Sequence, residues 1–161
     1  MTLMEMLLVV GIIAIVGLFS AVAISSARSR MRDTKRVADV RQFQSVLEDY
    51  YQMHNAYPEG QGVRLGDPTT SRCLRDGGFA PSGRGASSVF MNVVPAEYPK
   101  GIGDVKCGNP AQTGYCYTRV ADGASYQLGF EIEHGIQEVG IEKGANCLIP
   151  EAGIRSGICP E

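Results

Sequence analysis

The sequence lacks several features that would place it in a common functional class. It has no tryptophan, 7% of its residues are aromatic and 20% are charged, whereas glycine is frequent, with 20 residues in 161. Its net charge of −2 gives no overall positive field that would point to nucleic acid as a partner. This composition predicts a loop-rich domain that is held together by more than a large aromatic core.

Motifs of catalysis and of common cofactor sites are also missing. The sequence has no HExxH, no Walker loop and no GxGxxG between a strand and a helix. His54 and His134 lie near no serine or cysteine nucleophile motif, and the aspartates are too scattered to form an EF-hand loop. We therefore expect a protein that is not an enzyme and that has no cofactor, catalytic residue or metal site.

Five cysteines are present, but none forms a CxxC pair, so a zinc site is a poor fit. An exported domain with disulfides fits better, because such bonds persist in oxidising compartments. We predict the bonds Cys147–Cys159 and Cys107–Cys116, since each closes a short local loop. Cys73 would then be left without a disulfide partner.

The first 27 residues are almost entirely apolar. Met6 to Ala27 is a run of 22 residues without a charge, and as a helix it would be about 33 Å long, enough to cross a bilayer core. The run has no basic start and continues into a helical pattern, so we expect it to be retained rather than removed as a signal peptide. The exception is Glu5, since a carboxylate inside hydrocarbon costs on the order of 2.5–3.5 kcal/mol.

Two interpretations of Glu5 follow from its chemistry. The α-amino group of Met1 is one helical turn away, so Glu5 of one copy could meet the amine of the next copy if chains stack with an axial offset. Alternatively, Glu5 reaches the lipid headgroups or pairs within its own chain. The residues alone leave both interpretations open.

A second pattern predicts that the helix continues to about residue 54. No proline occurs before Pro58, which would stop the helix after a break at Asn55. The helix would have about 50 residues, apolar all round over 1–27 and amphipathic over 28–54. The apolar stripe of the second half recurs at helical spacing and comprises Val40, Phe43, Leu47 and Tyr50.

Positive charge gathers directly after the apolar run. Residues 28–41 carry an excess of four positive charges, which leaves −6 for the remainder of the chain. They could form a solvated helix face, or they could meet lipid phosphates or the acidic remainder of neighbouring copies. The basic residues are Arg28, Arg30, Arg32, Lys35, Arg36 and Arg41.

Residues 55–113 are dense in glycine, proline, serine and aspartate. We interpret them as a long loop that connects the helix to a sheet, with one short helix over 86–94. Such a loop is tolerated in a compact domain mainly when it is functional or held in place, and the cysteines could hold it.

An antiparallel sheet is predicted over residues 114–143. Two strands, at 115–120 and 125–133, would be joined by a turn at Asp122-Gly123, and a third strand would follow at 137–143. Leu128 and Phe130 lie on the apolar face that would pack on the helix stripe. The predicted fold class is therefore α+β, with residues 144–161 as a disulfide-clipped segment on the surface.

Two blocks of sequence resemble type IV pilins and the pseudopilins of type II secretion. MTLME, residues 1–5, is similar to the [FM]-T-L-x-E start of the mature proteins, and the apolar run follows it as in that family. The second block begins with RDTKR at 32–36 and ends with NAYP at 55–58, and it resembles RDxxR…D…L…YY…NGxYP. VPAEYP at 94–99 is a weaker match to VPxDP.

The resemblance implies roles for residues near the N-terminus. A membrane peptidase would remove a short basic leader and methylate the amine of Met1, and Glu5 would pair with that amine in a neighbouring subunit. Many family members carry proline near position 22, where this chain has Val22. Gly11 and Gly17 remain as assembly residues, either through local stretching of the helix or because small residues let helices approach closely.

The function implied is that of a major pilin, the structural subunit of a type IV pilus used in surface adhesion and twitching motility. Its partners would be other copies of itself, the prepilin peptidase, the assembly ATPase with its inner-membrane platform, membrane lipid before assembly, and host or other surfaces. DNA is a weaker candidate partner, through Arg84 or the Arg72–Arg75 segment. The protein would lie in surface filaments, with a pool in the cytoplasmic membrane.

Three alternatives remain open at this point. The chain could be a pseudopilin or a minor pilin of a type II secretion or DNA-uptake apparatus. It could also be a membrane-anchored binding or sensor domain that does not polymerise. An enzyme is the least favoured alternative.

Overall fold

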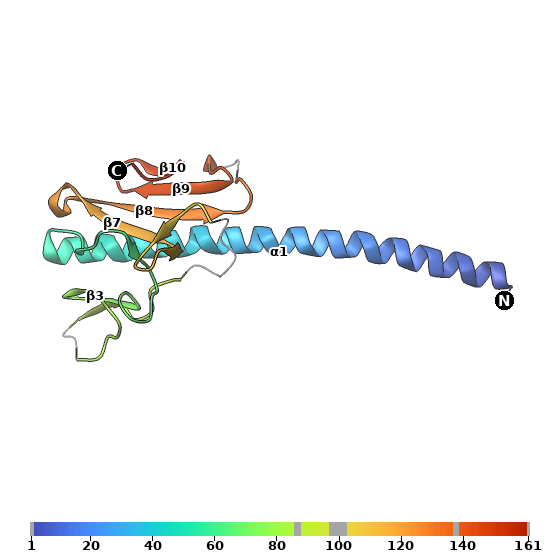
Figure 1. The fold of residues 1–161 in the computed structure, drawn as a ribbon, viewed down its shortest axis with the longest axis horizontal. Helices are drawn as coiled ribbons and strands as arrows, with labels where there is room; N and C mark the ends of the chain where they lie inside the picture. The colour runs from blue at the N-terminus through green and yellow to red at the C-terminus, as the bar shows by residue number, and fades with distance from the viewer. Residues whose placement is uncertain (1, 86–87, 97–102, 137–138, 161) are drawn as a thin grey trace. The chain divides into compact units, whose positions relative to one another are not determined.

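The computed structural model describes residues 2–85, 88–96, 103–136 and 139–160. The chain divides into two compact units, Met1–Arg32 and Asp33–Glu161. Helix α1 (Leu3–His54, 52 residues) contributes to both units (Figure 1). The long helix predicted from the sequence is therefore confirmed.

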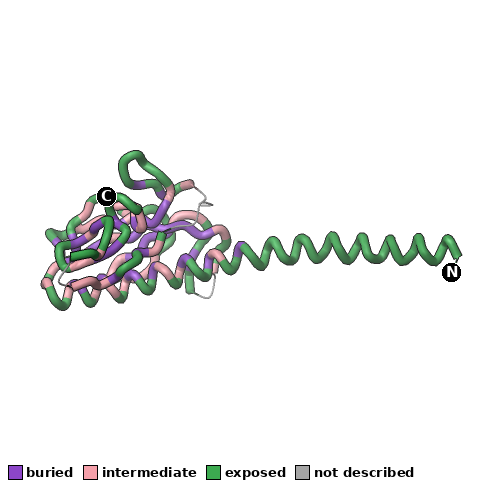
Figure 2. The backbone as a smooth tube through the Cα atoms, turned by 90° about the horizontal axis from the view of Figure 1, so that it is seen from below, coloured by how far each residue is buried: buried purple, intermediate pink, exposed green. Residues whose placement is uncertain are grey.

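The first unit consists of the apolar half of α1. Its residues are exposed on every side up to Arg28, as the continuous green trace of Figure 2 shows. Phe19, for example, is 74% exposed. Within the described part of the chain, α1 is one helix that is long and apolar enough to cross a membrane.

The second unit begins with the amphipathic half of α1. The predicted stripe of Val40, Phe43, Leu47 and Tyr50 is buried along its whole length. The helix stops at Asn55, which adopts a left-handed conformation with φ of +54°, and its N–H donates to the Tyr51 carbonyl. Asparagine tolerates this conformation better than most residues and commonly ends helices in this way.

A five-stranded antiparallel sheet packs against this half of the helix (Figure 1). The strand order is β1-β7-β8-β9-β10, with the registers Tyr117↔Leu128 and Leu128↔Leu148 across its centre. The β7–β8 turn is a short 3-10 segment, η1 (Ala121–Gly123), at the predicted position. The strands are β1 (Val63–Arg64), β7 (Cys116–Val120), β8 (Ser125–Ile132), β9 (Gly144–Ile149) and β10 (Gly153–Ser156).

The core lies between the sheet and the helix stripe. Leu128 and Phe130 are fully buried in one cluster with the four stripe residues of α1. Aromatic contacts cross this interface, and the Phe43 and Tyr117 rings meet edge to face with centroids 6.4 Å apart. The predicted packing of strand on helix and the α+β class are confirmed.

The connecting segment 55–113 contains more regular structure than the sequence indicated. A three-stranded sheet has the order β3-β2-β4, and a two-stranded sheet pairs β5 with β6. The helix predicted at 86–94 is wrong in its described part, because Leu74 pairs with Met91 and draws this segment into a strand. Residues 86–87 lie outside the described residues. The strands are β2 (Cys73–Arg75), β3 (Gly78–Ala80), β4 (Val89–Met91), β5 (Lys106–Cys107) and β6 (Gln112–Thr113).

The predicted end of the sheet at residue 143 is also wrong. Strand β9, which follows that position, lies between β8 and β10, and its Leu148 is fully buried. The strand predicted at 137–143 begins outside the described residues, and its Ile141 forms only an isolated bridge with Ile136. Pairing with β8 on one side and β10 on the other buries the centre of β9, so only the last part of the chain is a surface segment clipped by a disulfide.

Candidate assembly site

The first turn of α1 contains a reciprocal pair of hydrogen bonds. The Glu5 N–H donates to the Thr2 hydroxyl oxygen, and the Thr2 N–H donates to the Glu5 carboxylate, each with an N···O distance of 3.4 Å. This is a capping box, which satisfies two N–H groups that lack partners at the start of a helix. The T-x-x-E spacing in the sequence was the signal for it. It is one form of the pairing within its own chain that the sequence left open for Glu5.

The other predicted partner of Glu5 cannot be placed. Met1, the predicted site of methylation, lies outside the described residues. Glu5 itself is exposed, and its contact to Thr2 is long for a charged acceptor. A carboxylate held in this way can exchange its amide partner for a cation at little cost.

Gly11 and Gly17 serve no contact within the described chain. A Cβ atom added to either residue would meet nothing within 4 Å. Each glycine lowers helix propensity by about 1 kcal/mol relative to alanine. Packing within this chain therefore does not explain why glycine stands at either position.

Two serines of the apolar run, Ser20 and Ser25, form hydrogen bonds to the helix itself. The Ser20 hydroxyl donates to the Val16 carbonyl at 2.8 Å, and the Ser25 hydroxyl donates to the Val22 carbonyl at 2.9 Å. A hydroxyl that donates to a carbonyl of its own helix needs no hydrogen-bond partner outside the helix, even on an apolar surface. The run therefore presents an apolar surface whose one carboxylate is at its start.

The second unit opens with a buried charge cluster. Arg36 donates to Asp33 at 2.9 Å and to Glu133 at 3.1 Å, and both Asp33 and Arg36 are 2% exposed. The two oxygens of Asp33 also accept the backbone N–H groups of Glu133 and His134, at 2.7 and 2.8 Å. This Asp33 cluster ties α1 to the end of β8. Arg36 is therefore not part of a solvated or lipid-facing basic face, which corrects that part of the prediction.

Both predicted disulfides are present, Cys107–Cys116 and Cys147–Cys159. The register places Cys116 and Cys147 on either side of Gly129 in one row across the sheet. A Cβ atom at Gly129 would lie 3.7 Å from the Cys159 sulfur. The two bonds therefore fasten a loop and the C-terminal tail side by side on the same sheet face. Cys73 is buried, has no disulfide and donates to the Ala80 carbonyl.

Glu131 was missed by the sequence analysis. Its side chain is fully buried, and its carboxylate accepts the backbone N–H groups of Gly103 and Val105. An acidic residue between the apolar Phe130 and Ile132 is the only signal the sequence offers. The contact holds the connecting segment over β8, next to the two disulfides.

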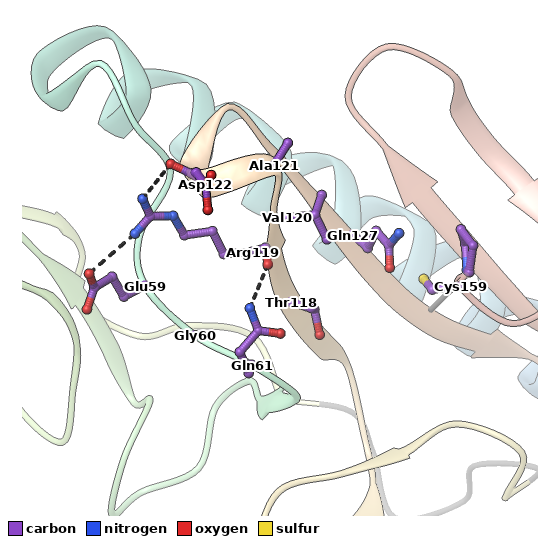
Figure 3. Close-up of a pocket in the computed structure, with 11 residues that line it drawn as sticks. Glu59, Gly60, Gln61, Thr118, Arg119, Val120, Ala121, Asp122, Gln127 and Cys159 are labelled. Carbon is purple, nitrogen blue, oxygen red and sulfur yellow. Dashed lines mark hydrogen bonds and ion pairs between the residues drawn. The ribbon is translucent and has the colours of Figure 1, made fainter.

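A surface hollow with a volume of about 1190 Å³ lies beside the β7–β8 turn (Figure 3). Arg119 donates to the Asp122 carbonyl at 2.8 Å and to the exposed Glu59 at 3.4 Å. Glycine is favoured at Gly123 because its φ is +94°, and a Cβ atom there would also displace the Arg119 guanidinium. These contacts lock a turn in which Ala121 and Asp122 both have positive φ, and they build no nucleophile–base pair.

The raised pKa values of the buried tyrosines are also those expected of a structural core. Burial raises the pKa of Tyr117 and Tyr126 well above the usual value for tyrosine. Burial and the hydrogen bond to Glu48 raise the pKa of Tyr57. Among the described residues, no group of three or more histidine, cysteine or acidic side chains could hold a metal ion.

The fold and site define a class of protein: an α+β domain with two disulfides that includes the second half of a helix whose first half is apolar and exposed. Comparison of the chain with protein-family models, with curated proteins and with solved structures finds no match.

Proposed function

We propose that this chain is the major pilin of a type IV pilus, which polymerises through the apolar half of α1. The observation that carries the proposal is the surface of residues 3–27, which is apolar, exposed on every side and interrupted by one carboxylate at its first turn. The resemblance of residues 1–58 to type IV pilins supports the same assignment.

Three residues favour a polymer over a simple membrane anchor. An anchor needs only apolar surface, so it has no use for the carboxylate of Glu5 or for Gly11 and Gly17, each of which weakens the helix. In a bundle of helices the two glycines permit close approach, and the carboxylate finds a cation on a neighbour. The charge opposes movement of a lone subunit that would draw Glu5 into hydrocarbon, and a cation on a neighbour removes that penalty in a docked one.

The assembly step exchanges one partner of Glu5 for another. In the lone chain its carboxylate accepts the Thr2 N–H. In the filament it would pair with the amine of Met1 on the next subunit, which sets the axial register of helices that would otherwise slide. The apolar halves would form the filament core, and the disulfide-fastened domains would form its outer surface for adhesion.

The proposal places the chain in two locations in succession. It would first lie in the cytoplasmic membrane, after processing and methylation by the prepilin peptidase. The assembly ATPase and its membrane platform would then add it to a surface filament. The role is structural rather than enzymatic, and surface attachment or DNA contact would be a property of the filament.

A pseudopilin or minor pilin is the second candidate, since it would share the same helix and Glu5. The abundance of the chain in filaments distinguishes a major pilin from a pseudopilin or minor pilin. Filaments sheared from native cells should consist mostly of this chain, seen by electron microscopy and identified by mass spectrometry, with one added methyl on Met1. Filaments that contain only traces of the chain would reject the major-pilin assignment.

Variants at the first turn test the role of Glu5 itself. Glu5→Gln removes the charge but keeps a side chain that fits a capping box, whereas Thr2→Ala breaks the box and keeps the charge. We expect Glu5→Gln to reduce filament yield at least tenfold and Thr2→Ala to leave most of it. The opposite ranking would mean that Glu5 acts by capping the helix, and the proposed pairing would be wrong.

A further inference from the structure

Three arginines end the first unit of the chain. Arg28 and Arg30 are exposed, and Arg32 is half-buried. At about 100° per residue, Arg28 and Arg30 project from opposite sides of α1, and Arg32 returns to the side of Arg28. These residues, here termed the arginine collar, therefore place positive charge on two opposite sides of the helix directly after its apolar run.

The dimensions of the collar match those of a bilayer. The uncharged run Met6–Ala27 spans about 33 Å as a helix, close to the roughly 30 Å of a hydrocarbon core. Headgroups add about 5–7 Å on each side, and the rise from Arg28 to Arg32 is about 6 Å. With the apolar run in hydrocarbon, the collar falls within one headgroup layer.

We propose that the arginine collar binds the phosphates of membrane lipids, prefers anionic headgroups and fixes the depth of the unassembled subunit. Guanidinium groups match phosphate oxygens in charge and in bidentate geometry. The inference rests on the membrane pool in the proposed function and adds a ligand and a site to it.

The collar also determines where Glu5 lies before assembly. Glu5 precedes Arg28 by 23 residues, which is about 35 Å along the helix. With the collar in one headgroup layer, Glu5 reaches the opposite layer and stays hydrated. Movement of the helix toward the side of the collar would draw the carboxylate into hydrocarbon, where it needs a cationic partner. The collar therefore sets the starting depth, and Glu5 then opposes extraction of a lone subunit but not of one in which the carboxylate is paired.

Because the chain has no tryptophan, a single introduced tryptophan can serve as the fluorescent probe for the test. Phe19→Trp places a single indole at a position that is 74% exposed, nine residues before Arg28. That distance is about 14 Å, which puts the indole near the bilayer midplane. The full chain is reconstituted in equimolar phosphatidylcholine and phosphatidylglycerol, with one lipid or the other brominated on its acyl chains to quench the indole by contact.

The matched comparison uses two double variants on the Phe19→Trp background. Arg28→Gln/Arg30→Gln removes two charges from the collar. Arg84→Gln/Arg155→Gln removes two exposed charges from the second unit and changes the net charge equally. Relative association of the two lipids with the helix is read from the ratio of quenching by brominated phosphatidylglycerol and brominated phosphatidylcholine.

We expect phosphatidylglycerol to be preferred several-fold, on the order of five, near an intact collar. The preference should fall to about one in Arg28→Gln/Arg30→Gln and persist in the control. Equal quenching by both lipids in the parent chain would overturn the proposal that the collar binds anionic lipid. An equal loss of the phosphatidylglycerol preference in both double variants would overturn it as well. Neither result would affect the filament proposal. No quenching by either lipid would overturn the collar together with the membrane step of that proposal, whereas filament yields of the Glu5 variants test assembly separately.

Discussion

The two halves of α1 belong to one continuous helix but relate to their surroundings in opposite ways. Phe19 in the first half is 74% exposed, and Phe43 in the second half is 1% exposed. The second half buries one stripe against its own sheet, whereas the first half offers apolar side chains on all faces to something outside the chain. Helix formation is therefore shared by the two halves, but the source of their stabilisation is not.

This difference explains why the sequence changes character near residue 28. A stripe needs apolar residues only at helical spacing, so the second half can carry charge on its remaining faces. A segment covered by lipid or by other helices must be apolar all round, and full burial gains about 1.5–3 kcal/mol for each large side chain. The first half contributes that gain only when something covers it.

The largest expected effect comes from the same substitution in both halves. Phe43→Ala should lower the free energy of unfolding of the disulfide domain by about 3–5 kcal/mol, because it opens a cavity in the core. Phe19→Ala should change it by less than about 0.5 kcal/mol. The measurement is denaturant unfolding of the full chain in detergent, followed by near-ultraviolet circular dichroism of the tyrosines. Similar losses of unfolding free energy in the two variants would contradict the difference drawn between the two halves of α1.

A second prediction concerns the charge cluster at the start of the second unit. Asp33→Ala removes the carboxylate that pairs with buried Arg36 and accepts two backbone N–H groups. The expected loss of unfolding free energy is about 3 kcal/mol, since buried Arg36 loses one of its two carboxylate partners and two backbone N–H groups lose their acceptor. The control Asp49→Ala removes an exposed carboxylate from the same helix and should cost less than about 0.5 kcal/mol. Equal effects would show that the Asp33 cluster does not hold α1 to the sheet.

A third prediction is that the Cys147–Cys159 disulfide stabilises the second unit and has no effect on the first. Replacing Cys147 and Cys159 with alanine should cost about 2–3 kcal/mol, mainly by freeing the unfolded chain. Thermal unfolding of the domain reports this loss, and helicity and detergent binding of the apolar half should stay constant. Cys73→Ala is the control, because that thiol forms no disulfide. If the control destabilises as much as the double variant, packing rather than cross-linking explains the effect.

Much of the fold could be predicted because its signals are local. The helix stripe, strands β7 and β8 and the short disulfide loops all follow from periodicity or spacing within a few residues. Strand β9 could not be placed, because its position between β8 and β10 depends on pairing that no local pattern encodes. Strand β4 was mistaken for a helix for the same reason, since its pairing with β2 outweighs the local propensity of a three-residue segment.

The candidate site was predicted less completely than the fold. Glu5 stood out because a carboxylate contrasts with an apolar run, and the glycines stood out because they weaken a helix. The capping box with Thr2 went unnoticed, although its spacing is readable. The roles of Asp33 and Glu131 depend on backbone N–H groups from distant segments, which the sequence does not bring together.

The smallest expected effect is at Asp67, an acidic residue on a turn of the second unit. Hydrogen bonds from Thr69 and from Arg64 hold the pKa of Asp67 below its usual value of 3.8. Since the folded pKa lies below the unfolded one, the stabilisation is present above about pH 4 and is lost as the pH falls through the folded pKa.

Thr69→Ala removes the largest of these contacts and should raise the pKa of Asp67 toward 3.8, as an NMR titration of the carboxyl carbon would show. Stability at neutral pH should change little, because the contacts of a carboxylate that remains in contact with water contribute little. The neighbouring variant Thr70→Ala should leave the pKa unmoved. A large loss of stability at neutral pH in Thr69→Ala would mean that surface contacts rather than the buried stripe hold the second unit. The contrast between the two halves of α1 would then need a different physical cause.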